Sequence, residues 1–72
     1  MTKRELLKQA RHVLGPDAKV AITRAGRLDW TVSAYAVNFG VSAGGIYRER
    51  AVERVNAMLI HLDTSGWRWS AQ

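Results

Sequence analysis

The chain contains no cysteine, one proline and one phenylalanine among its 72 residues. Without cysteine it can form neither a disulfide framework nor a thiolate metal site, and a thiol nucleophile is excluded. A domain of this length buries only about 60% of the surface that its unfolded chain exposes. Packing alone must therefore stabilise the core, and a homodimer is a further way to bury apolar surface.

Long apolar segments are absent too. No stretch approaches the roughly 18 consecutive apolar residues from which a membrane-spanning helix is recognised. Thr2-Lys3-Arg4-Glu5 leads directly into an amphipathic segment, with no signal-peptide hydrophobic block behind these charges. The sequence therefore predicts a single domain, residues 1–72, that is cytoplasmic and has no membrane partner.

Acidic residues are few beside basic ones. Eleven Lys and Arg face six Asp and Glu, which gives a formal net charge of +5 and a pI near 10.5. This imbalance favours acidic partners, of which nucleic acid is the commonest. Because the same excess also keeps a small protein soluble, charge alone does not decide the function.

A capping box and an apolar stripe predict a helix over residues 3–14. Thr2 is followed three positions later by Glu5, a pair whose side chains bind each other's backbone at a helix start. The apolar positions at helical spacing are Leu6, Leu7, Ala10, Val13 and Leu14. Gly15-Pro16 then ends the helix.

Alternating apolar and polar residues between 18 and 35 predict an antiparallel β-hairpin. The apolar residues expected on one sheet face are Val20, Ile22, Leu28, Trp30, Val32 and Ala34. Arg24-Ala25-Gly26-Arg27 separates the two halves and suits a three-residue turn at Ala25-Gly26, with Gly26 in the left-handed conformation. The alternation continues through Val37, Phe39 and Val41, which predicts a third, weaker strand within 37–43 that ends at Gly44-Gly45.

A second helix is predicted over residues 47–62. Its apolar positions are Ala51, Val52, Val55, Met58, Leu59 and Leu62. Asp63-Thr64-Ser65-Gly66 ends it, and residues 67–69 could add a short final strand. Two amphipathic helices and one amphipathic sheet bury their apolar faces by stacking, so the predicted fold is a small two-layer α+β domain of order α-β-β-(β)-α.

No pattern of residues indicates an enzyme. His12, His61 and the carboxylates do not stand at the spacing of a metal or catalytic site. Residues 40–44 match the Gly-x-Ser-x-Gly nucleophile elbow formally, but Ser42 has no triad partners in a suitable context. These glycines also lack the following Lys-Ser/Thr of a P-loop. The sequence therefore predicts a non-enzymatic protein with no metal and no cofactor.

Residues 31–48 also allow a second interpretation, which rests on a set of eight residues. They are Thr31, Val32, Ala36, Gly40, Val41, Ser42, Ile46 and Tyr47. They resemble the helix-turn-helix of tetracycline-repressor-type regulators, and this resemblance implies an alternative all-α fold in which Ala36 lets two helices approach and Gly40 supplies the turn. The hairpin fold is preferred because Trp30-Thr31-Val32 has strand-forming chemistry and Gly44-Gly45 would weaken a recognition helix.

The candidate binding surface is basic. On the second helix the spacing of three, four and seven residues places one ridge beside the apolar stripe, made of Tyr47, Arg50, Arg54 and His61. The hairpin turn adds Arg24 and Arg27. Guanidinium groups beside an aromatic ring suit phosphate and base contacts, and equally an acidic protein surface. The alternative is a solvated helix face on which Arg50 pairs with Glu53.

Two functions remain open. The first is a nucleic-acid-binding accessory or regulatory protein of bacterial, phage or plasmid type. The second is a phage- or mobile-element-encoded inhibitor that binds a protein of a host system, as anti-CRISPR proteins do. The second rests on small size, the lack of catalytic groups and the α+β pattern. Trp67 and Trp69 suit either edge packing or base stacking.

Overall fold

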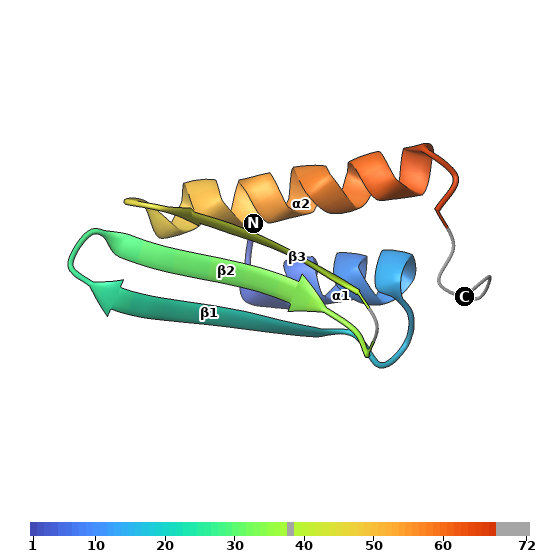
Figure 1. Ribbon diagram of the computed structural model, residues 1–72, viewed down its shortest axis with the longest axis horizontal. Helices are drawn as coiled ribbons and strands as arrows, with labels where there is room; N and C mark the ends of the chain where they lie inside the picture. The colour runs from blue at the N-terminus through green and yellow to red at the C-terminus, as the bar shows by residue number, and fades with distance from the viewer. Residues whose placement is uncertain (38, 68–72) are drawn as a thin grey trace.

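A computed structural model describes residues 1–37 and 39–67. Its elements are α1 (Lys3–Leu14), β1 (Lys19–Gly26), β2 (Asp29–Tyr35), β3 (Gly40–Gly45) and α2 (Arg48–Thr64). The strands form one antiparallel sheet in the order β1-β2-β3, and both helices pack against the same face of it (Figure 1). The predicted two-layer α+β fold is thus confirmed, with β3 present.

The helix α1 begins and ends where its local sequence predicts. The Thr2 hydroxyl accepts a hydrogen bond from the Glu5 N–H at 3.2 Å, and the Glu5 carboxylate accepts one from the Thr2 N–H at 2.9 Å. At the other end Gly15 adopts a positive φ of 117°, a conformation that favours glycine. Its N–H donates to the carbonyl of Arg11. Both ends are therefore stabilised by local contacts.

The β1-β2 hairpin forms, but its turn lies two residues later than predicted. Arg27 and Leu28 connect the strands, and the register shifts between Arg24 and Gly26, so Ala25 is the extra residue of a bulge. Among the described residues only Gly15 and Gly66 have a positive φ, so the predicted left-handed Gly26 is wrong. Burial of alternate β2 residues against the helices sets the register, and the bulge absorbs the extra residue.

The third strand, β3, starts later than predicted. Val37 and Phe39 lie in the connection that precedes it, where the N–H of Ala36 donates to the carbonyl of Phe39 at 2.7 Å. A Cβ at Gly40 would lie 2.9 Å from the Cβ of Tyr35 on the neighbouring strand. Glycine is therefore needed where β3 begins.

One core lies between the sheet and the two helices. Its buried residues are Leu6, Ala10, Val13, Leu14, Ala18, Val32, Ala34, Ala51, Val52, Val55 and Leu59. Four predicted apolar positions are exposed: Leu28 in the turn (65%), Val37 (89%) and Phe39 (39%) before β3, and Met58 (39%) on α2. Met58 is on the flank of α2 beside β3, the last strand that the described residues contribute to the sheet.

The all-α alternative is not adopted, because residues 31–35 and 40–45 are strands. Val32 and Ala34 are fully buried against the helices, a long-range context that a local pattern does not contain. Of the predicted final strand, residues 68 and 69 lie outside the described part of the chain. Trp67 is half-buried and its ring lies 5.1 Å from that of Phe39. No helix within residues 1–37 and 39–67 has the length and apolarity needed to cross a membrane.

Truncating Leu59 tests the core. Leu59→Ala is expected to lower the free energy of unfolding by about 2–5 kcal/mol, because this side chain is fully buried and its loss leaves a cavity. The matched control is Met58→Ala, one residue away and partly exposed, which should cost less than about 1 kcal/mol. Urea unfolding followed by circular dichroism measures both, and equal losses would contradict this packing.

Because of the capping box, we expect the free energy of unfolding to depend on pH in the acidic range. The hydrogen bonds from the backbone and side chain of Thr2 lower the pKa of Glu5 below its ordinary value of 4.5. The ionised form is favoured by folding, so its stabilising effect is present above pH 4.5 and is lost as the pH falls through the lowered pKa. The difference in unfolding free energy between wild type and Glu5→Gln should shrink over that range. A constant difference from pH 6 to pH 3 would show that the box does not respond to protonation.

Candidate functional site

The hairpin turn and the start of α2 lie at the same end of the molecule, on the left in Figure 1. β3 runs antiparallel to β2, so its last residue, Gly45, pairs with Trp30 near the start of β2. The hairpin turn precedes β2 and α2 follows β3, and the two segments therefore lie at the same end of the sheet. We call this region the basic end; its residues are Arg24, Arg27, Trp30, Tyr47, Arg48, Arg50 and Arg54.

Two contacts hold the Arg24 side chain in the basic end. Its guanidinium lies over the Trp30 ring, 5.3 Å from the ring centroid, and its Nε donates to the carbonyl of Gly26 at 2.9 Å. Within residues 1–37 and 39–67 no group accepts a hydrogen bond from its two Nη atoms. Arg24 is thus oriented by Trp30 and still presents donors outward. Arg27, in the exposed turn, has no such contact in that part of the chain.

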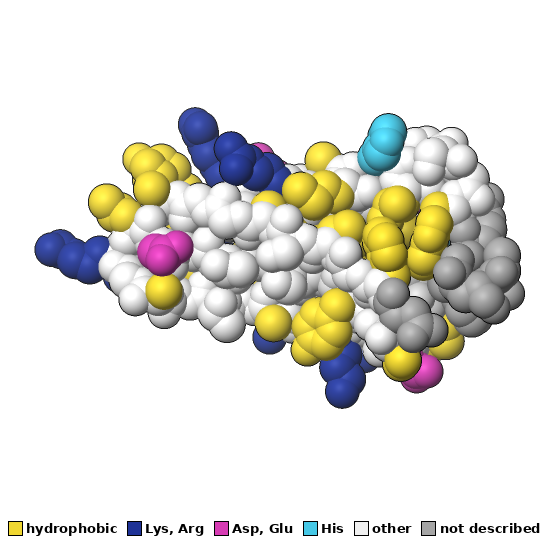
Figure 2. All heavy atoms as spheres, in the orientation of Figure 1, with side chains coloured by type: hydrophobic (Ala, Val, Ile, Leu, Met, Phe, Trp, Pro, Cys, Tyr) yellow, Lys and Arg dark blue, Asp and Glu magenta, His cyan; other side chains and the backbone are white. Residues whose placement is uncertain are grey.

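The arginines of α2 are positioned by an aromatic ring and by the sheet. The Arg50 guanidinium lies 5.7 Å from the centroid of the Tyr47 ring, and Arg54 donates from Nη1 to the carbonyl of Gly44 at 3.2 Å. No ion pair joins Arg50 to Glu53 among the described residues. Together with Glu53 and Ala57 the two arginines line a shallow depression. Figure 2 shows basic side chains gathered over this end of α2.

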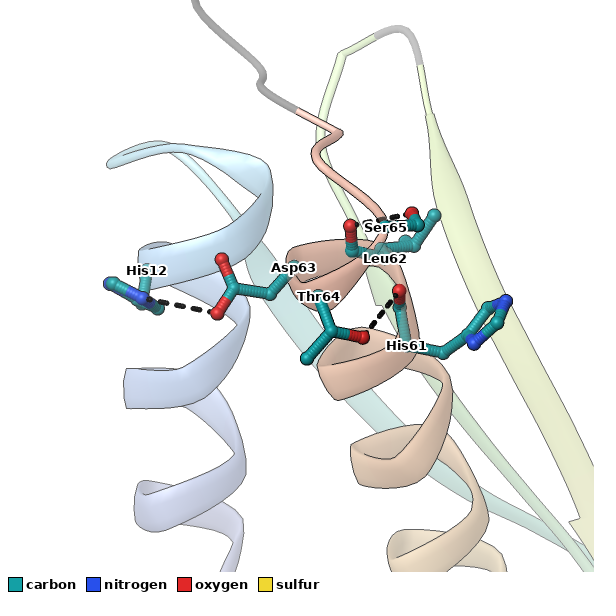
Figure 3. Close-up of polar contacts among 6 residues, drawn as sticks. All are labelled: His12, His61, Leu62, Asp63, Thr64 and Ser65. Carbon is teal, nitrogen blue, oxygen red and sulfur yellow. Dashed lines mark hydrogen bonds and ion pairs between the residues drawn. The ribbon is translucent and has the colours of Figure 1, made fainter.

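His61 lies on the same helix but away from the basic end. It is seven residues from Arg54, about 10 Å along the helix axis. Figure 3 shows its ring pointing away from α1, whereas Asp63 points toward α1. There Asp63 Oδ2 lies 3.8 Å from His12 Nε2, a contact between the two helices that sequence reasoning missed. The structure therefore brings together five of the six candidate residues, with His61 apart.

Trp30 is the functional candidate that sequence analysis assigned to the core. It is half-buried and is not part of the buried cluster, and it supports Arg24. Trp30 lies directly opposite Arg24, and this pairing could have indicated its role. The pairing follows only from a turn at residues 27–28, which the sequence did not predict. Ile46 and Leu28 add exposed apolar surface at the same end.

The face of the sheet not covered by helices carries small side chains. Its described residues include Ala21, Thr23, Thr31, Ser33 and Ser42, and the Ser33 hydroxyl donates to that of Ser42 at 3.1 Å. Stacking of unpaired bases needs a series of aromatic rings. In the described part of this face Tyr35 alone supplies one, so the face is not a base-stacking platform.

The described residues form no evident catalytic centre. No three His, Asp or Glu side chains gather as metal ligands within residues 1–37 and 39–67. In the same part of the chain the hydroxyl of Ser42 contacts Ser33 and no histidine. The basic end is therefore the chemically distinctive surface.

No family model, curated protein or solved structure matches the chain.

Proposed function

We propose that this protein is a non-enzymatic accessory or regulatory protein that binds the backbone of a nucleic-acid duplex through its basic end. The observation that carries the proposal is the convergence of the hairpin turn and the start of α2. Residues 24–30 and 47–54 contain five arginines and three carboxylates, a surplus of two positive charges on one small surface.

The positions of these arginines suit phosphate recognition. A guanidinium presents a planar fork of donors that matches phosphate oxygens. Contacts with Trp30, Tyr47 and Gly44 restrain three of the side chains before any ligand binds. Binding then costs less side-chain entropy than it would with freely rotating cations.

The start of α2 adds backbone donors to the same surface. Tyr47 occupies the N-cap position and makes no side-chain hydrogen bond to the first turn. The N–H groups of a first helical turn have no partner within the helix, and the helix dipole makes this end favourable for anions. Phosphate oxygens could therefore be bound by main-chain and guanidinium groups together.

A duplex fits better than a single strand. Single-stranded ligands are usually held by aromatic rings spread over an open surface, and the uncovered sheet face lacks such a series. The rings of Trp30 and Tyr47 instead lie against guanidinium groups. Cations on two separate elements suit two lines of phosphates beside a groove, a contact that positions a protein without reading sequence.

The variant Arg50→Ala with Arg54→Ala tests this function. We expect it to bind a short duplex more weakly, and the slope of log affinity against log salt to fall by about 0.9 for each DNA phosphate that the variant no longer binds. Both side chains are exposed, so the free energy of unfolding should change by no more than roughly 1 kcal/mol in total. Fluorescence anisotropy with duplex DNA, duplex RNA and the corresponding single strand, each at several salt concentrations, measures the effect.

The matched control removes the same charge elsewhere. The double variant Lys8→Ala with Lys19→Ala changes one residue on α1 and one at the opposite end of β1. It should reduce duplex binding less than the loss of Arg50 and Arg54 does. Equal losses in both variants would mean that net charge, not the basic end, attracts the ligand. Tighter binding of the single strand would exclude the duplex as the preferred ligand. A partner protein, the alternative, would show a weaker salt dependence.

A further inference from the structure

Among residues 1–37 and 39–67, no strand pairs with the outer edge of β3. The N–H of Ala36 donates to the carbonyl of Phe39, and hydrogen-bonded pairs alternate with non-bonded pairs along an antiparallel ladder. Gly40, Ser42 and Gly44 therefore belong to the non-bonded pairs with β2, and their N–H and C=O groups point to the free edge. The Gly44 carbonyl accepts a hydrogen bond from Arg54, as expected for a carbonyl that points away from β2.

The two edges of the sheet differ in their protection. Proteins usually block an edge strand with charges, proline or a bulge. The edge strand β1 has Lys19, Arg24 and the bulge at Ala25. β3, with the sequence Gly-Val-Ser-Ala-Gly-Gly, has no charge, no proline and no register shift. β3 is therefore the edge that can accept another strand.

The flank of α2 beside this edge is basic and apolar. The hydrogen bond to the Gly44 carbonyl places Arg54 of α2 beside Gly44 of β3. With about 1.5 Å per helix residue and 3.4 Å per strand residue, Met58 lies near the level of Ser42. Met58 is exposed, as is Phe39 beside the other end of the strand. Glu53 lines a shallow depression together with Arg50 and Arg54, so one carboxylate faces two guanidinium groups and the flank stays cationic.

We propose that β3 accepts an extended acidic segment of a partner protein as a fourth strand. Its backbone pairs with Gly40 and Ser42, its carboxylates contact Arg50 and Arg54, and its apolar side chains cover Met58. A second copy fits less well, because pairing two β3 strands would bring two cationic α2 flanks together. This site rests on the sheet edge and goes beyond the nucleic-acid function.

The variant Ser42→Pro tests strand addition. Proline removes an N–H that points to the free edge, so the bonds with β2 remain. Ser42→Ala is the control, because it also lacks the hydroxyl but keeps the N–H. The probe is an end-capped, fluorescent peptide in which Thr alternates with Glu, Glu and Val, so that the acidic and the apolar side chains share the strand face toward α2. It should bind wild type and Ser42→Ala equally, and Ser42→Pro up to about tenfold more weakly, the effect of removing one hydrogen bond.

The specificity of peptide binding and the place where the peptide binds are measured with the wild-type protein. These measurements test the proposal even if Ser42→Pro does not fold. The same peptide with Lys in place of Glu should not bind. The amide signals of Gly40 and Ser42 should shift on adding the Glu peptide, and those of Val20 and Ile22 on the other edge should not. Absence of binding, or shifts on β1 alone, would overturn the proposal.

Two further results separate this site from its alternatives. If sedimentation shows a dimer that Ser42→Pro converts to a monomer, the occupant is a second copy and the proposal is wrong. Arg24→Ala with Arg27→Ala should weaken duplex binding and leave peptide binding unchanged, because these residues lie on the hairpin turn, not at the β3 edge. Loss of peptide binding in that variant would place the peptide at the basic end and overturn the β3 site.

Discussion

Val32 and Ala34 of the central strand β2 are fully buried between the sheet and the two helices. Side chains of a strand alternate between its faces, so a slip of one residue would replace them with Thr31, Ser33 or Tyr35. Such a slip would bury hydroxyl groups and expose the apolar side chains. The register of β2 is therefore strongly constrained, and both neighbouring strands take their positions from it.

The basic end follows from that register. With Val32 opposite Ile22 and Ala43, Trp30 must lie opposite Arg24 and Gly45. The first pairing puts a guanidinium over an indole ring, and the second brings the start of α2 to the hairpin turn. Packing inside the molecule thus determines where the cations lie outside it. Electrostatic attraction of an acidic ligand would depend on this apolar core.

Arg54 connects the two surfaces described for this protein. It belongs to the basic end by position, and it bonds the outward carbonyl of Gly44 on the otherwise unprotected edge of β3. A guanidinium has five donors, so one bond to the sheet leaves others for a phosphate or a carboxylate. A duplex and an acidic strand would therefore draw on the same side chain while their remaining contacts lie on different elements.

The sequence by itself determined the features that arise from local contacts: α1 with its capping box at Thr2 and its glycine stop, the body of α2, and the presence of three strands. Only the tertiary structure decided the hairpin turn at residues 27–28, the exposure of Met58 and the role of Trp30. These depend on which strand and which helix lie opposite, a long-range relation that periodicity does not encode. The same holds for residues 31–48, which resemble a helix-turn-helix but form strands because Val32 and Ala34 are buried in the sheet.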